Sequence, residues 1–391
     1  MNDAQTFDVV IVGGGLAGAS LAVALAPLPL KIALVETAAF PETKPAWDER
    51  CIGLNEATRG IFERMGVWAS IRPEAEPILS THISERGRFG IARFTAAEAG
   101  LDALGYNTPM RALGSVLWKK ISAAPNLRVI CPVQVTALTH TPDAVRLTLS
   151  TTESLSARLV VAADGAQSTV RRMLGVGSEE HNYGQTAVVG AVKPERAHRG
   201  VAYERFTPDG PIAMLPRPNN HCVSIWTVPA EKSKEILNWG DARYLAEFQA
   251  AFGNRLGRFL ETGRRGGYPL SRVMSEKLTA ARTIFAGNAA QTLHPVAAQG
   301  FNLGLRDVAT LAGLLKGTAD PGAPELLHEY ARRRESDRQS VAGFTDKLVR
   351  TFSNDLPGLR GLRHLGLLAL DLIPPAKDAV MRQNLGQNAA L

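Results

Sequence analysis

The N-terminal segment constrains the fold more than any other part of the chain. An apolar, β-branched run at residues 7–12 leads directly into a glycine-rich turn at 13–18, and an alanine- and leucine-rich segment follows at 19–26. A second apolar run at 31–35 ends on Glu36. Short uninterrupted runs of this kind are typical of buried parallel strands, and the segment between them favours a helix. The sequence therefore predicts a strand–helix–strand unit, the start of an α/β fold.

The glycine-rich turn fits the pattern Gly-x-Gly-x-x-Gly, in which each glycine has its own physical role. Gly13 permits the tight turn, Gly15 lets the backbone approach a pyrophosphate, and Gly18 packs the helix on the strand. The N-terminus of the helix presents free N–H groups to the anion. Glu36 can accept hydrogen bonds from adenosine ribose hydroxyls, which argues against a 2′-phosphate here. The unit predicts a dinucleotide-binding site but does not choose between FAD and NAD.

Two later segments make that choice. An apolar run at 158–163 leads into Asp164 and Gly165. Another run at 283–286 leads into the segment Gly-Asn-Ala-Ala-Gln-Thr-Leu-His-Pro, which begins at Gly287, and a helix is predicted over 303–315.

In this order, the three motifs resemble those of the class A flavoprotein aromatic hydroxylases, which share the para-hydroxybenzoate hydroxylase fold. The resemblance covers essentially the whole chain. The amino-acid sequence of residues 287–308 is similar to that of the ubiquinone-biosynthesis monooxygenases, and within that branch to that of the 2-polyprenyl-6-methoxyphenol hydroxylases. The resemblance implies bound FAD, with contacts at Gly13, Gly15, Gly18, Glu36, Arg50, Arg111, Asp164, Gly165, Arg171, Gly287, Asn288, Pro295, Gly300, Phe301 and Asn302.

The family usually has aspartate at the position of Asn288, where it binds a ribityl hydroxyl of FAD. Asparagine keeps a carbonyl acceptor, so the contact can survive without the charge. Pro295 is expected beside the isoalloxazine. The turn at Gly300, Phe301 and Asn302 is expected to place N–H groups and a helix N-terminus at its pyrimidine edge, where reduced flavin is anionic. A simple helix cap is the alternative for this turn.

Other candidates have structural alternatives. Arg50 and Arg111 match arginines that reach the pyrophosphate or hold the flavin, but each can equally form a surface ion pair. Asp164 and Arg171 fit a motif that contacts FAD and the NAD(P)H route, and their alternative is a turn with an ion pair. His294 is a candidate for acid–base catalysis beside the flavin, or a structural residue before a proline. No histidine spacing suggests a metal site.

The resemblance also implies a reaction. NAD(P)H would reduce FAD, O2 would form a flavin C4a-hydroperoxide, and a lipophilic phenol would take one oxygen atom on its ring. No second glycine fingerprint is present for NAD(P)H, as is usual in this family. Two alternatives stay open: hydroxylation of another aromatic substrate with the same cofactor chemistry, and a non-catalytic FAD-binding subunit of a biosynthetic complex.

The expected architecture is α/β, with a Rossmann-like FAD-binding domain interwoven with a mostly antiparallel β-sheet substrate domain and a helical C-terminus. Successive strand-like runs between residues 185 and 228 predict the antiparallel sheet. Met214, Leu215 and Pro216 can line the substrate pocket or belong to the core. The predicted boundaries are 1–75, 105–177 and 280–345 for the FAD-binding domain, 76–104 and 178–279 for the substrate domain, and 346–391 for the C-terminal segment.

Composition narrows the partners and the compartment. The net charge is +7, but Lys and Arg are dispersed, which disfavours nucleic acid. Their only run, at 332–334, is most simply a solvated face of a long helix over 325–352. Three separated cysteines fit a reducing cytoplasm. A leucine-dense stretch at 359–372 packs on the FAD-binding domain, or contacts a partner or the inner membrane surface as a peripheral amphipathic helix.

Overall fold

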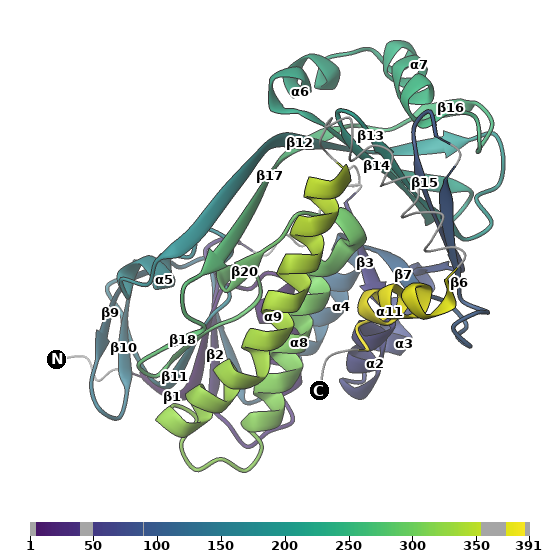
Figure 1. Cartoon of the computed structure of the whole chain (residues 1–391). Helices are drawn as coiled ribbons and strands as arrows, with labels where there is room; N and C mark the ends of the chain where they lie inside the picture. Colours follow the sequence, from purple (N-terminus) through teal and green to yellow (C-terminus); the bar gives the residue numbers. More distant parts are fainter. Residues whose placement is uncertain (1–4, 40–49, 89, 353–372, 388–391) are drawn as a thin grey trace.

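The described part of the protein contains three β-sheets with helices packed around them (Figure 1). The structure is a computed structural model that describes residues 5–39, 50–88, 90–352 and 373–387.

The first sheet contains the predicted strand–helix–strand unit. Its strands are β1 (Gln5–Val12), β2 (Ile32–Val35), β8 (Leu127–Ile130), β9 (Val135–His140), β10 (Val145–Leu149), β11 (Ser154–Ala162), β18 (Thr279–Ala280) and β19 (Thr283–Phe285). The order is β18-β19-β11-β1-β2-β8, with β10 joined to β11 and β9. β1 pairs in parallel with β2 on one side and with β11 on the other, so the strand order reverses beside β1. Such a reversal opens a crevice at the carboxyl ends of the strands.

The second sheet is mostly antiparallel, as predicted. Its strands are β5 (Ser80–Glu85), β6 (Ile91–Thr95), β12 (Ser178–Pro194), β13 (Val201–Thr207), β14 (Gly210–Arg217), β15 (His221–Pro229), β16 (Phe259–Thr262), β17 (Gly266–Ser275) and β20 (Gln291–Thr292). The order is β20-β17-β12-β15-β14-β13-β5-β6, with β16 paired to β12, and among these described strands only β13 and β5 pair in parallel. The long strands β12 and β17 run diagonally from the first sheet toward the upper part of the molecule (Figure 1).

A small third sheet and the helices complete the fold. The third sheet has the order β3-β7-β4, with β3 (Cys51–Asn55), β4 (Glu76–Ile78) and β7 (Gly105–Pro109). The helices are α1 (Leu16–Leu25), α2 (Glu56–Arg64), α3 (Trp68–Ile71), α4 (Met110–Ser122), α5 (Thr169–Met173), α6 (Ala230–Leu237), α7 (Asp241–Phe252), α8 (Gln299–Leu314), α9 (Pro324–Phe352) and α11 (Pro374–Leu385), with short 3-10 turns η1 (Arg72–Glu74), η2 (Gly287–Ala289) and η3 (Val296–Ala298). In Figure 1, α8 and α9 lie side by side. α6 and α7 lie at the top of the view, where they pack on one face of the second sheet.

The sheets bury their apolar faces in different cores. The largest core surrounds the parallel strands of the first sheet. All four residues of β2 are buried in this core. A second core lies between the second sheet and the helices α6 and α7, and it contains Met214, Trp226 and Phe248. The boundaries between the FAD-binding and substrate domains stay a prediction.

One expectation about the long helix α9 is wrong. Arg332 and Arg333 are solvated and pair with Glu329, but Arg334 is 1% exposed and pairs with Asp307 of α8. Consecutive residues of a helix point in directions about 100° apart, so three adjacent arginines cannot share one solvated face. The leucine-dense stretch 359–372 lies outside the described residues. Among those described, no helix combines the length and apolarity needed to cross a bilayer.

Candidate active site

A cavity of about 740 Å³ opens at the carboxyl ends of β1 and β11, in the crevice where the strand order reverses. Its walls come from distant segments: the turns after β1 and β11, the turn η2 and the start of α8. The volume falls in the range of roughly 300–1,000 Å³ that is typical of ligand sites. The predicted residues that line it are Gly13, Gly15, Glu36, Asp164, Gly165, Gly287, Asn288, Pro295, Gly300 and Phe301.

The three glycines of the fingerprint differ in their surroundings. Gly13 has a φ of +104°, and a Cβ atom there would lie 2.5 Å from the carbonyl oxygen of Ala163. At Gly18, a Cβ atom would lie 1.9 Å from the carbonyl oxygen of Gly13. At Gly15 it would meet no heavy atom within 4 Å, although Gly15 borders the cavity. The protein's own packing therefore requires Gly13 and Gly18, whereas Gly15 leaves space for a ligand.

Two carboxylates border the same cavity. Glu36, directly after β2, accepts a hydrogen bond from the backbone N–H of Gly14. Asp164, after β11, accepts hydrogen bonds at its Oδ2 atom from the hydroxyl of Thr169 (3.0 Å) and the N–H of Val170 (3.1 Å). Its Oδ1 atom is buried and has no hydrogen-bond partner in the described part of the chain. Because a buried acceptor without a donor is costly, Oδ1 fits a ligand hydroxyl or N–H group.

Two helix N-termini border the cavity. α1 begins after Gly15 and α8 begins after Ala298, and neither has a side-chain cap. Ala298 is left-handed, with φ of 50° and ψ of 35°, a conformation that is uncommon for a residue with a Cβ atom. Gly300 and Phe301, in the first turn of α8, line the cavity. Unsatisfied N–H groups and the positive ends of two helix dipoles thus border one space, which suits an anionic cofactor.

Asp307 of α8 fixes the turn η2, which carries Asn288, by hydrogen bonds on the side away from the cavity. The Oδ2 atom of Asp307 accepts hydrogen bonds from the N–H of Gly287 (3.1 Å) and from Nε2 of Gln291 (2.7 Å). Its Oδ1 atom accepts one from Nε of Arg334 (2.7 Å). Asp307 therefore positions one wall of the cavity without lining it.

Sequence reasoning did not single out Asp307. A signal was present, because Leu303, Asp307 and Leu311 are spaced four residues apart and share one face of a helix. All three are buried. An acid in an apolar stripe requires a buried partner, and here that partner is Arg334.

Five of the predicted cofactor contacts lie outside the large cavity. Arg50 has its guanidinium carbon 5.5 Å from the ring centre of Tyr268. Arg111 borders a separate polar cavity and lies 3.7 Å from a Glu74 oxygen.

Arg171 and Asn302 fasten backbone segments together. Arg171 is buried and donates to the carbonyl oxygens of Ala289 (2.8 Å) and Ala166 (2.9 Å), so it ties the turn after β11 to the turn η2. The Asn302 amide donates to the carbonyl oxygen of Gly53 (2.8 Å), and its oxygen accepts from the N–H of Asn55 (3.0 Å). Gly18, the remaining predicted residue outside the cavity, is packed against the turn that Gly13 makes.

A second cavity of about 250 Å³ adjoins the first and is mostly apolar. Leu215 lines it, whereas its neighbour Met214 points into the core on the other side of the sheet. Strand alternation thus separates two residues that the sequence could assign only as pocket or core. The residues that line both cavities are Gly53, Leu215, Ile225, Pro295 and Ala298.

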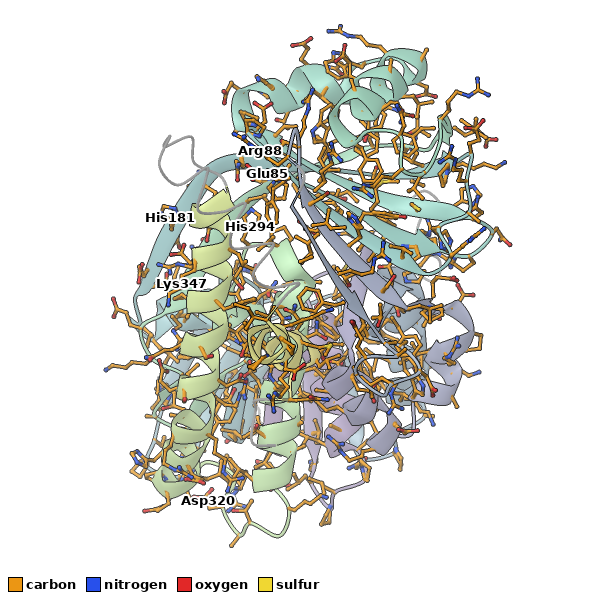
Figure 2. The ribbon with its side chains drawn as sticks, turned by 45° about the vertical axis from the view of Figure 1, so that its right-hand side comes forward. Glu85, Arg88, His181, His294, Asp320 and Lys347 are labelled. Carbon is orange, nitrogen blue, oxygen red and sulfur yellow. The ribbon has the colours of Figure 1, made fainter. Side chains whose placement is uncertain are left out.

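His294 borders neither cavity. It is 1% exposed, its Nδ1 atom accepts the N–H of Val296 at 3.2 Å, and its ring meets the ring of Tyr183 edge-on at 5.0 Å. Figure 2 labels it to the right of His181 of β12. Burial lowers the pKa of His294 to about 4. The imidazole is therefore neutral at neutral pH, with Nε2 carrying the proton.

This burial gives a pH dependence of stability. The folded pKa is lowered below the ordinary value of about 6.5, so below that pH the unfolded chain binds the proton and the folded chain does not. Between about pH 7.5 and about pH 5.5, His294→Asn should lose about 1.4 kcal/mol less stability than the unsubstituted protein. Asparagine keeps an acceptor for the Val296 N–H. Urea unfolding at both pH values measures the difference, and equal losses would contradict the neutral, buried state.

Comparison with known proteins identifies the class. A family model described as an FAD binding domain matches residues 6–345. The ubiquinone hydroxylase UbiL of Rhodospirillum rubrum is 37% identical over 97% of this chain and 89% of that protein. The 3-demethoxyubiquinol 3-hydroxylase of Escherichia coli is 31% identical over 98% of this chain and 99% of that protein. The chain belongs to the FAD-binding family of flavoprotein monooxygenases, and it is an FAD-dependent aromatic hydroxylase.

Solved structures agree on the fold. The p-nitrophenol 4-monooxygenase PnpA of Pseudomonas putida superposes with a TM-score of 0.81 at 18% identity and covers 99% of this chain and 100% of that one. PqsL of Pseudomonas aeruginosa superposes with a TM-score of 0.77 at 21% identity and covers 93% of this chain and 99% of that one.

The residues of the large cavity fit FAD. The space at Gly15 and the N-terminus of α1 would take the pyrophosphate, and Glu36 would take the adenosine ribose. The buried Oδ1 atom of Asp164 would accept from a hydroxyl of the cofactor. The first turn of α8, at Gly300, would face the isoalloxazine.

Proposed function

We propose that this enzyme hydroxylates the aromatic ring of a polyprenyl phenol in ubiquinone biosynthesis, with NAD(P)H as reductant and O2 as oxygen source. The similarity to the ubiquinone hydroxylase UbiL of Rhodospirillum rubrum and the 3-demethoxyubiquinol 3-hydroxylase of Escherichia coli supports the pathway. A 2-polyprenyl-6-methoxyphenol is the substrate that the sequence resemblance favours.

The observation that carries the proposal is the apolar cavity beside the cofactor cavity. Side chains such as Ile83, Phe94 and Leu385 line it, which suits a ring with a hydrocarbon tail. Pro295 and Ala298 border both spaces, so a ring in the small cavity would lie against the cofactor. Such contact is needed for oxygen transfer, and apolar walls exclude the water that would waste reducing equivalents.

The chain's own residues would orient the substrate ring, shield the site from water and stabilise charge on the cofactor. Bound FAD would supply the redox chemistry, which is reduction by NAD(P)H and delivery of one oxygen atom from O2. The N-terminus of α8 would stabilise negative charge at the pyrimidine edge, near Gly300 and Phe301. Leu215 and Ile225 of the second sheet, which line both cavities, would cover the face of the cofactor ring system that is turned toward the substrate.

A lipid-soluble substrate also favours contact with a membrane surface. We place this contact, as part of the same proposal, in the C-terminal segment 346–391, whose leucine-dense stretch has the composition of an interfacial helix. Flotation of the full chain with anionic vesicles would test it, and absence of the protein from the vesicle fraction would contradict it.

Anaerobic reduction of the purified flavoprotein tests the substrate class. We expect NADH or NADPH to bleach the flavin faster when a short-tailed prenyl methoxyphenol is present. Admission of ¹⁸O2 should then give a ring-hydroxylated product with one labelled oxygen. If the protein binds FAD but gives no labelled product with any prenyl phenol, another aromatic substrate or a partner-dependent enzyme becomes the better reading.

A further inference from the structure

The small apolar cavity contains a single charged side chain among the described residues that line it, and that side chain is Glu204 of β13. Among the described residues that line the cavity, Tyr203 carries the other ionisable group, and burial raises the pKa of its phenol above the ordinary value of about 10. A carboxyl group in such surroundings is costly unless a partner compensates for its lost hydration. The position therefore calls for an explanation.

The register of the second sheet directs Glu204 toward the cavity. Glu204 pairs with Ile83 of β5 and with Ala213 of β14, and Ala213 pairs with Ile225 of β15. Paired residues point to the same face of a sheet, and all four line the cavity. Ile225 also borders the cofactor cavity. At about 4.8 Å per strand, Glu204 lies roughly 10 Å across the sheet from Ile225.

Within the described part of the chain, the carboxyl group of Glu204 has no hydrogen bond or ion pair. Burial alone raises its pKa to about 7, with no cation to oppose the shift. Other carboxylates of this sheet are paired, such as Glu179 with Arg272 and Glu261 with Lys193. Glu204 thus faces the cavity with its acceptor atoms unused, which is the arrangement expected of a ligand contact.

We propose that Glu204 binds the phenolic hydroxyl of the substrate and accepts its proton during hydroxylation. This rests on the proposed function, since it requires a phenol in the small cavity. The hydroxyl would sit at Glu204, on the side of the cavity away from Ile225, and the ring would extend toward the cofactor.

The proton and electron balance is simple. The carboxylate takes the proton from the phenol oxygen, and the electron pair of the O–H bond moves into the ring. The ring carbon would then form a bond to one oxygen atom of the O2 molecule that bound, reduced FAD activates, while the O–O bond breaks and its electron pair leaves with the other oxygen atom. Loss of the C–H proton from that carbon would restore the aromatic ring. This proton and one from the reduced cofactor would join the departing oxygen atom, which leaves as water, and Glu204 would return its proton to the phenol oxygen. The carboxylate is regenerated, and no further oxidant is needed.

Three variants test the assignment in the FAD-loaded enzyme. Glu204→Gln keeps the shape but cannot take a proton, Glu204→Asp keeps a carboxylate, and Glu231→Gln removes an exposed acid of α6 as the control. We expect Glu204→Gln to retain FAD, to bind the phenol up to about tenfold more weakly because the neutral amide replaces a carboxylate acceptor, and to lower kcat for product formation by about 10²-fold or more. NAD(P)H oxidation should continue and release H2O2. Glu204→Asp should recover part of the product, and Glu231→Gln should match the unsubstituted enzyme.

The pH profile separates a proton acceptor from a merely structural residue. For the unsubstituted enzyme, kcat/KM for product should rise as the pH increases through about 7, because the carboxylate form is needed. This rise should persist in Glu204→Asp and disappear in Glu204→Gln. A Glu204→Gln enzyme with normal kcat and an unchanged profile would overturn the assignment.

A binding measurement on the unsubstituted enzyme covers the case in which Glu204→Gln does not fold. A short-tailed prenyl phenol should bind at least about tenfold more tightly than its O-methyl ether above pH about 7, and this advantage should shrink at lower pH. Equal affinities at both pH values would overturn the assignment. If the unsubstituted enzyme hydroxylates no prenyl phenol, the proposed function itself is wrong; if it does so and Glu204→Gln does so equally well, only the role of Glu204 is lost.

Discussion

Replacing Gly18 with alanine is expected to yield a protein that has lost FAD and much of its stability. The new Cβ atom would lie 1.9 Å from the carbonyl oxygen of Gly13, which is far inside van der Waals contact. Relief requires α1 to move away from the end of β1, in the centre of the largest core. Overpacking of this kind costs about 1–3 kcal/mol, and more where backbone atoms collide. The melting temperature without FAD and the flavin absorbance after purification measure the two effects.

Gly15→Ala is the matched control for this prediction. A Cβ atom at Gly15 meets nothing within 4 Å, so the melting temperature without FAD should stay unchanged. Because Gly15 borders the cavity at the N-terminus of α1, the affinity for FAD should nevertheless fall. Titration of both apoproteins with FAD separates a packing role from a binding role. If Gly18→Ala melts like Gly15→Ala, the contact between Gly18 and Gly13 does not limit stability.

Replacing Arg334 with methionine is expected to destabilise the protein by about 3–5 kcal/mol, because the substitution leaves the Asp307 carboxylate buried with its main charge partner removed. Asp307 also holds the N–H of Gly287, so the turn η2 should loosen and the affinity for FAD should fall with stability. Urea unfolding and FAD titration measure the two losses.

Arg332→Met is the control on the same helix. Arg332 is solvated and pairs with Glu329, so its loss should leave the unfolding midpoint close to that of the unsubstituted protein. A double variant, Asp307→Asn with Arg334→Met, removes both charges and should recover much of the stability. If the double variant is as unstable as Arg334→Met alone, the ion pair is not the source of the loss.

Local patterns predicted most of the elements, because each depends on residues close in sequence. The run at 7–12 lies within β1, and the predicted helix at 325–352 matches α9 to within one residue. β13 and β14 lie within the predicted strand region 185–228 and β15 ends one residue beyond it, whereas β12 already begins at Ser178. α8 begins at Gln299 rather than at 303, because the left-handed Ala298 allows the helix to start directly at the cavity. That conformation depends on tertiary packing and leaves no mark in the local sequence.

The parts of the site that the sequence missed are those that depend on a partner from another element. Asp307 is decisive only because Arg334 of α9 packs on α8. Glu204 could be recognised from strand alternation, since it is in phase with Ala202 and Phe206, but only the register with β5 and β14 shows which face meets a cavity. Pattern alone gives the phase of a strand and not what its faces meet.

The wall shared by the two cavities ties their occupants together thermodynamically. An occupant of either cavity contacts the same five residues, so an occupant of one cavity restricts the wall conformations that an occupant of the other cavity meets. These residues are Gly53, Leu215, Ile225, Pro295 and Ala298. Linkage then requires reciprocity: the factor by which a phenol changes the dissociation constant of FAD equals the factor by which FAD changes that of the phenol. If a ring analogue lowers the dissociation constant of FAD by some factor, the FAD-loaded protein will bind that analogue more tightly than the FAD-free protein by the same factor.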